Sequence, residues 1–91
     1  MNYIEEDNRF VAYNDKKQEV GEVTFTRAGE TMFIIDHTFV KEGYNGQGIA
    51  QELVRLVVDK ARTENKLIIP LCPFAKREFQ KKAEYHDVLK K

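Results

Sequence analysis

The segment of residues 44–50, Tyr-Asn-Gly-Gln-Gly-Ile-Ala, most constrains how this chain can fold, because it stands between an apolar run and an amphipathic run. Residues 32–40 have the character of a strand, and residues 49–61 repeat apolar side chains at helical spacing. Glycine lets the backbone turn sharply and approach an anion closely. The first N–H groups of a helix have no intrahelical partner and carry partial positive charge. A glycine loop that opens directly into a helix is therefore a candidate site for phosphate.

The loop is also compatible with functions other than phosphate binding. It also fits a flexible connection between strand and helix, and spacing alone does not separate the two interpretations. A Rossmann dinucleotide site needs a parallel β-α-β opening and an acidic residue at the end of the next strand. Here the next expected strand ends in Leu71-Cys72. A nucleotide-triphosphate P-loop fails as well, because no Lys-Ser or Lys-Thr pair follows the glycines.

The remaining patterns predict an α/β protein with the element order β-β-β-α-β-α. The alternation of Val23 and Phe25 with polar residues is typical of a half-buried strand. Residues 31–40 are apolar on both faces, which predicts a central strand covered on both sides. Pro70 lacks an N–H, so its strand is expected to be at an edge, splayed or bulged there. Strands are expected at residues 9–13, 20–27, 31–40 and 67–72, with helices at 49–61 and 74–85.

This order predicts a mixed, mostly antiparallel sheet with helices packed on it, because a crossover after the first helix returns the chain to a parallel strand. Its length predicts a single domain at residues 1–91. The 15 basic and 15 acidic residues cancel, which argues against a nucleic-acid binder. No apolar run suits a membrane span or a signal peptide. With one cysteine, Cys72, no internal disulfide forms, so a cytoplasmic protein is expected.

Residues 40–50, followed by Leu53, resemble the acetyl-CoA-binding motif of the GNAT N-acetyltransferase family, Gln/Arg-x-x-Gly-x-Gly/Ala. Asn45 takes the first place of the motif, Gly48 the glycine place and Ala50 the last, and Asn45 departs from the usual Gln or Arg. Three short segments are also similar to a small GNAT-like subgroup that lacks the early helices of the acceptor site: Asp36-His37-Thr38, Gly48-Ile49-Ala50 and Cys72-Pro73-Phe74.

The resemblance implies that the chain binds acetyl-CoA as a cosubstrate and transfers the acetyl group to an amine of a protein, peptide or polyamine. Backbone N–H groups of residues 46–51 would hold the pyrophosphate, and Phe39 and Val40 would offer backbone groups to the pantetheine amides. With so little chain outside the cofactor site, the acceptor site is expected to be open or completed by another subunit. The residues expected at the cofactor are Phe39, Val40, Asn45, Gly46, Gln47, Gly48, Ile49, Ala50, Gln51, Cys72 and Phe74.

Cys72 and His37 are the candidate catalytic residues. In the family register Cys72 stands near the thioester, and a helix N-terminus beside it favours the thiolate. The alternative is a buried cysteine that acts as a small hydrophobe. Histidine titrates near neutrality, which suits the base that deprotonates the amine, although a lone strand histidine is more often structural. Neighbouring strand residues point to opposite faces, so at most one of Asp36 and His37 is expected to face the cleft.

Phe79 occupies the place of the tyrosine that protonates the thiol in the family. Phenylalanine has no proton to donate. A second function therefore stays open, an acyl-CoA-binding sensor or interaction module that does not catalyse transfer. No metal site is expected, because the two distant histidines and the one cysteine lack the spacing of metal ligands.

Overall fold

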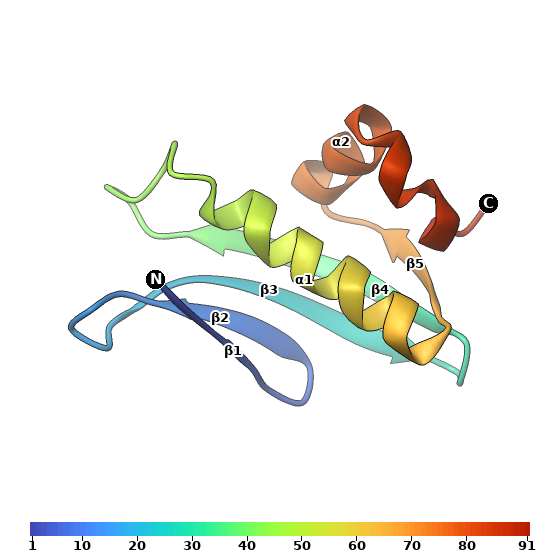
Figure 1. The fold of residues 1–91 in the computed structure, drawn as a ribbon, viewed down its shortest axis with the longest axis horizontal. Coiled ribbons are helices and arrows are strands. Elements are labelled where there is room, and N and C mark those ends of the chain that lie inside the picture. The colour runs from blue at the N-terminus through green and yellow to red at the C-terminus, as the bar shows by residue number, and fades with distance from the viewer.

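The computed structural model describes all 91 residues and contains one five-stranded sheet, crossed on one face by a long helix (Figure 1). The strands lie in chain order, and all neighbours are antiparallel except the last pair, which is parallel. The predicted mixed α/β fold is thus confirmed. The elements are β1 (Asn2–Glu5), β2 (Arg9–Tyr13), β3 (Glu19–Ala28), β4 (Met32–Val40), α1 (Ile49–Glu64), β5 (Leu67–Pro70), α2 (Pro73–Lys81) and a final 3₁₀ helix, η1 (Ala83–Val88).

The core lies between the sheet and α1, which contacts β2, β3, β4 and β5. Apolar residues recur along α1 at helical spacing, so one face of the helix is fully buried. Where the helix begins, it sits very close to the sheet. A Cβ added at Gly21 would lie 3.1 Å from Ile49 Cγ2 and 3.2 Å from the Phe39 carbonyl oxygen. A glycine in β3 therefore fixes the first turn of α1 directly above the end of β4.

The prediction that β4 is covered on both faces is wrong. Phe33 and Ile35 are buried beneath the helices, but Phe39, on the opposite face, is 52% exposed. The helix α2 packs beside α1 and against β4 and β5, on the same side of the sheet. Apolar residues on both faces of a strand indicate two covering layers only when the chain supplies a second layer. Here the far face of the sheet has no covering helix.

The largest departures from the predicted elements are an additional strand, a longer first helix and a broken last helix. Strand β1 was not expected, because its polar ends hide the alternation that its pairing with β2 requires. Helix α1 continues to Glu64 and ends at Asn65, whose φ of 57° is left-handed. The expected last helix breaks at Lys82, and the chain folds back so that the Tyr85 ring lies 5.5 Å from that of Phe79. In one unbroken helix these two side chains would lie on different faces.

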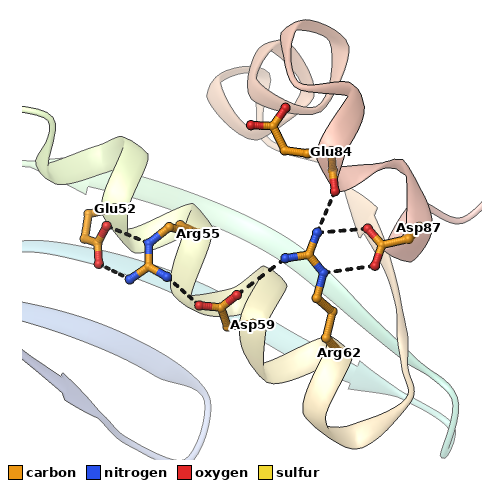
Figure 2. A network of polar contacts seen from close by, with 6 residues as sticks. All are labelled: Glu52, Arg55, Asp59, Arg62, Glu84 and Asp87. Carbon is orange, nitrogen blue, oxygen red and sulfur yellow. Dashed lines mark hydrogen bonds and ion pairs between the residues drawn. The ribbon is translucent and has the colours of Figure 1, made fainter.

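A chain of ion pairs runs along α1 from Glu52 in its first turn to Arg62 in its last, and joins that last turn to η1 (Figure 2). Arg55 pairs with Glu52 and Asp59 on the helix surface. Arg62 donates from Nε and Nη2 to the two carboxylate oxygens of Asp87, at 2.9 Å each, and also donates to the Glu84 carbonyl. The end of α1 is thereby fastened to the last turn of the chain. None of the helices has the length and apolar character needed to cross a membrane.

Candidate functional site

A cleft of about 250 Å³ opens where α1 begins beside the end of β4. Phe74, at the start of α2, closes one side. The structure brings eight of the predicted cofactor residues into the lining and leaves Phe39, Gln47 and Cys72 outside it. The full lining consists of Thr38, Val40, Tyr44, Asn45, Gly46, Gly48, Ile49, Ala50, Gln51 and Phe74.

The glycine loop has a left-handed backbone at three positions. The φ angles of Gly43, Gly46 and Gly48 are 92°, 81° and 78°. Any residue with a Cβ is strained at such φ angles. The backbone conformation alone therefore explains why glycine occupies these positions, although no neighbouring atom would clash with a side chain. A Cβ added at Gly46 or Gly48 would meet no atom within 4 Å, so the space above the loop is open. The sequence therefore keeps both a sharp turn and free access to the loop backbone.

The start of α1 leaves a row of N–H groups without protein acceptors. The first helical hydrogen bond runs from the Glu52 N–H to the Gly48 carbonyl, and Gly48 supplies no side-chain cap. The N–H groups of residues 45–51 donate to no acceptor within the protein. Several convergent donors at the positive end of a helix fit a doubly charged pyrophosphate. By this measure the loop fits the anionic part of coenzyme A.

The edge of β4 beside the loop is open. The parallel pairing with β5 ends at Ile35 and Pro70, so of the arrangements expected for Pro70, an edge strand that parts from its neighbour is the one observed. The Lys41 N–H bonds to Val20 of β3, so by alternation the peptide groups of Thr38 and Val40 point away from β3, into the cleft. Those of Phe39 face β3. A chain with its own amides can therefore add to this edge at Thr38 and Val40.

Cys72 lies directly behind the cleft and is 8% exposed. Its Sγ is 3.3 Å from the hydroxyl of Thr38, which lines the cleft. The same sulfur accepts the Ala75 N–H at 3.4 Å, so Cys72 caps the N-terminus of α2. The thiol is thus buried, but it touches the cleft through one side chain. Sequence reasoning did not nominate Thr38, although its position two residues before Val40 puts both on one strand face.

His37 and Asp36 share one face of the sheet, which corrects the expectation that they point to opposite faces. The register of β3 against β4 shifts between Thr24 and Phe25, so Asp36 is an extra residue in β4. Beyond this β-bulge His37 pairs with Thr24, and Asp36 accepts a hydrogen bond from the Thr26 hydroxyl at 2.6 Å. Both side chains point away from α1. The cleft therefore lies on one face of β4 and His37 on the other.

Phe79, in the place of the family's tyrosine, lies in the core together with Tyr85. Phe79 is 2% exposed and Tyr85 is 5% exposed, and the two rings pack against each other. Lys76 lines a separate groove between α2 and η1. No group of three or more His, Cys, Asp or Glu side chains lies close enough together to hold a metal ion.

Strands β4 and β5 part at one end, and the N-terminus of α1 faces the gap between them. This arrangement is that of an N-acetyltransferase fold. A family model described as GCN5-related N-acetyl-transferase matches residues 9–88. A GCN5-like protein of Staphylococcus aureus, solved by NMR, is similar at 32% identity and a TM-score of 0.81, over 98% of this chain and 87% of that one. The chain belongs to the GCN5-related N-acetyltransferase (GNAT) family.

Larger relatives share part of this fold. A GNAT family N-acetyltransferase of Escherichia coli, solved in complex with CoA, is 26% identical with a TM-score of 0.63. That match covers 69% of this chain but only 38% of the other. A ribosomal-protein-alanine N-acetyltransferase of Brucella melitensis has the same fold at 24% identity and a TM-score of 0.65, over 91% of this chain and 61% of that one. A comparison of the sequence with curated proteins found no match.

Proposed function

We propose that this protein binds acetyl-CoA in the cleft and transfers its acetyl group to a primary amine. The observation that carries the proposal is the row of unpartnered N–H groups at residues 45–51, which adjoins the open edge of β4. The loop would hold the pyrophosphate, and the peptide groups of Thr38 and Val40 would pair with the pantetheine amides. The CoA complex of the E. coli relative supports the choice of ligand. A reducing compartment such as the cytoplasm suits the free thiol of Cys72.

Transfer requires a neutral amine, a polarised carbonyl and a stabilised leaving thiolate. In direct transfer, the amine nitrogen forms a bond to the thioester carbon, the C–S bond breaks, and the CoA thiolate takes up a proton. His37 is the candidate base on the acceptor side. Cys72 is the candidate thiol on the cleft side, where its contact with Thr38 can orient that hydroxyl. In a covalent alternative, the Cys72 thiolate displaces CoA, and the amine then displaces the Cys72 thiolate.

A second function, acyl-CoA binding without transfer, is favoured by one observation. Phe79, in the place of the family's proton-donating tyrosine, is buried in the core against Tyr85. No phenol from α2 therefore reaches the cleft. Under this alternative the protein is a sensor whose stability or partner binding responds to the acyl-CoA level.

Thermal unfolding and thiol release separate these functions. Acetyl-CoA at 100 times its Kd should stabilise the native protein by about 2.7 kcal/mol and raise Tm. Both functions are wrong if millimolar acetyl-CoA leaves Tm unchanged. An acceptor screen then scores free CoA thiol above background hydrolysis. A rise in Tm with no thiol release for any amine supports the sensor, whereas release with a subset of amines supports the transferase.

The two candidate residues are tested in the same assay. Mass spectrometry after incubation with acetyl-CoA detects an acetyl group on Cys72, and Cys72→Ser should abolish any such adduct while binding persists. Transfer by Cys72→Ser at the parent rate would exclude the covalent route. The pH dependence of transfer by His37→Gln tests the base. An unchanged pH profile would show that His37 does not take the proton.

A further inference from the structure

We propose that the sheet face turned away from α1 carries the acceptor site, and that it takes the side-chain ammonium group of a lysine in a flexible, basic polypeptide segment. This proposal rests on the proposed acetyl transfer and names its acceptor. The site is a patch formed by Glu22, Asp36, His37 and Phe39, here called the acceptor patch. Its members come from β3 and β4, next to the bulge in β4.

The acceptor patch combines two exposed rings with a carboxylate. The rings of His37 and Phe39 are stacked, with centroids 6.3 Å apart and 13° between their planes. The His37 side chain is 54% exposed and Phe39 is 52% exposed. Glu22 pairs with Phe39 across the strands, and its Oε2 lies 3.8 Å from His37 Nε2. An aromatic face beside a carboxylate is a favourable environment for an alkylammonium ion.

The charges around the acceptor patch also favour a cation. Arg9 donates hydrogen bonds to Glu6 at 2.7 Å, Glu22 at 2.9 Å and Glu19 at 3.1 Å. Three carboxylates therefore surround one guanidinium, and Asp36, which accepts the Thr26 hydroxyl, adds a fourth negative charge to the same face of the sheet. Arg9 engages Oε1 of Glu22 and leaves Oε2 directed at His37. A basic segment is attracted to this excess of negative charge, and an acidic segment is repelled.

The acceptor patch and the cleft lie on the two faces of the same short stretch of β4. Thr38 faces the cleft, and its neighbours His37 and Phe39 face the acceptor patch. No strand covers the edge between the two faces, because the pairing with β5 ends at Pro70. An amine that approaches over the patch can thus reach a thioester held along the open edge of β4.

The proton of the ammonium group passes to His37 in this arrangement. With Nε2 on the Glu22 side, Nδ1 of the ring accepts the proton, and the carboxylate of Glu22 stabilises the imidazolium that forms. The neutral nitrogen then attacks the thioester carbon, the C–S bond breaks, and the proton that the nitrogen loses passes to the departing CoA thiolate. Glu22 is a positioning residue, because it acts on the amine through His37.

A polypeptide lysine fits this surface better than a small free amine. No helix covers the acceptor patch and no wall surrounds it, since the far face of the sheet is open. A small amine would bind weakly here, because the open patch would bury only a small part of its surface. A lysine presents its amine at the end of a long stem, and the flanking basic residues of a segment add contacts with the carboxylates.

Two-dimensional NMR of the labelled protein in the presence of CoA tests the acceptor patch directly. The probe is a short Gly-Lys-Arg peptide with blocked termini, and its acetyl-lysine form is the matched control. We expect the charged peptide to shift the amide signals of residues 22–24 and 36–39, with weaker shifts from the acetylated form and in high salt. Spermine is titrated in parallel. Shifts at these residues with spermine but not with the peptide would overturn the polypeptide acceptor.

Steady-state kinetics supply the second readout. Glu22→Gln should raise the KM for the peptide at least tenfold and alter the pH profile of kcat, whereas the Kd for acetyl-CoA should not change. Glu30→Gln, in the exposed β3–β4 turn, is the control and should leave all three at parent values. If acetyl-CoA binds but the peptide shifts signals elsewhere, or Glu22→Gln behaves like Glu30→Gln, the acceptor patch is wrong. Failure to bind acetyl-CoA would instead overturn the proposed function and this proposal with it.

Discussion

The two ends of α1 differ in how their polar groups are used. At the N-terminal end, Gly48 provides no side-chain cap, and the N–H groups ahead of the first helical bond have no protein acceptors. At the C-terminal end, the Asn65 N–H donates to the Arg62 carbonyl, and the Arg62 side chain donates a hydrogen bond to Asp87. The same helix thus satisfies its polar groups internally at one end and leaves them for a ligand at the other. Substitutions at the two ends should therefore affect different properties.

The largest effect is expected at the ligand end, from Gly48→Val. A β-branched residue at a φ of 78° is strained, so the loop should move to another conformation and lose the convergence of its N–H groups. Isothermal titration should show an affinity for acetyl-CoA at least ~100-fold lower, because several hydrogen bonds to the diphosphate are lost together. The native state should lose only about 1–2 kcal/mol.

Gly29→Val is the matched control. Gly29 also has a left-handed φ, 66°, and an added Cβ there would meet no atom within 4 Å. It lies in the β3–β4 turn, away from the cleft lining. Its variant should lose a similar free energy of unfolding and bind acetyl-CoA normally. Equal losses of affinity in both variants would mean that binding depends on general stability rather than on the loop.

A smaller effect is expected where the ligand end is tied to the sheet. Asn14 Nδ2 donates to the Tyr44 hydroxyl at 2.9 Å, and the Asn14 side-chain oxygen Oδ1 accepts the backbone N–H groups of Lys16 and Gln18. Tyr44→Phe removes this tie, which is worth about 1 kcal/mol, or roughly a fivefold weaker Kd for acetyl-CoA. Tyr13→Phe, which removes a hydroxyl from β2, should have no effect on Kd. If the two variants bind equally well, the tie does not position the loop.

Local sequence signals predicted the ligand end more fully than the rest. The apolar run into β4, the glycines and the helical repeat from Ile49 each act over a few residues, so the strand, loop and helix start followed from them. The β-bulge at Asp36 depends on the register between β3 and β4, which no local pattern encodes. The expectation that Asp36 and His37 point to opposite faces was therefore wrong.

The stabilised end of α1 depended on long-range contacts that sequence patterns do not reveal. Arg62 and Asp87 are both polar surface residues, and their hydrogen bonds form only because the chain breaks at Lys82. That break allows Phe79 and Tyr85 to be buried together. Core packing, and not helix propensity, therefore decides where the helix ends. The catalytic assignments of Cys72 and His37 stay predictions.

At the C-terminal end of α1, Arg62→Ala should reduce the stability of the protein without changing its affinity for acetyl-CoA. It removes the hydrogen bonds to Asp87 and Glu84 that hold η1 against α1. Because these groups are largely solvated, Tm should fall by only a few degrees, and the Kd for acetyl-CoA should match that of the parent. Arg77→Ala, which removes an exposed arginine of α2, is the control and should leave Tm unchanged. A weakened Kd in Arg62→Ala would show that the two ends of α1 are coupled.

The smallest effect is expected from the response of the Arg62–Asp87 ion pair to acid. The Arg62 guanidinium, through its hydrogen bonds, lowers the pKa of Asp87 in the folded protein. A carboxyl with a lowered pKa stabilises the folded state above its ordinary pKa of about 3.9, and that contribution is lost as the pH falls through the lowered value. Urea unfolding at pH 7 should therefore separate the parent from Arg62→Ala, and the gap should narrow at pH 3. An equal gap at both pH values would mean that Arg62 acts through its bond to the Glu84 carbonyl, which does not titrate.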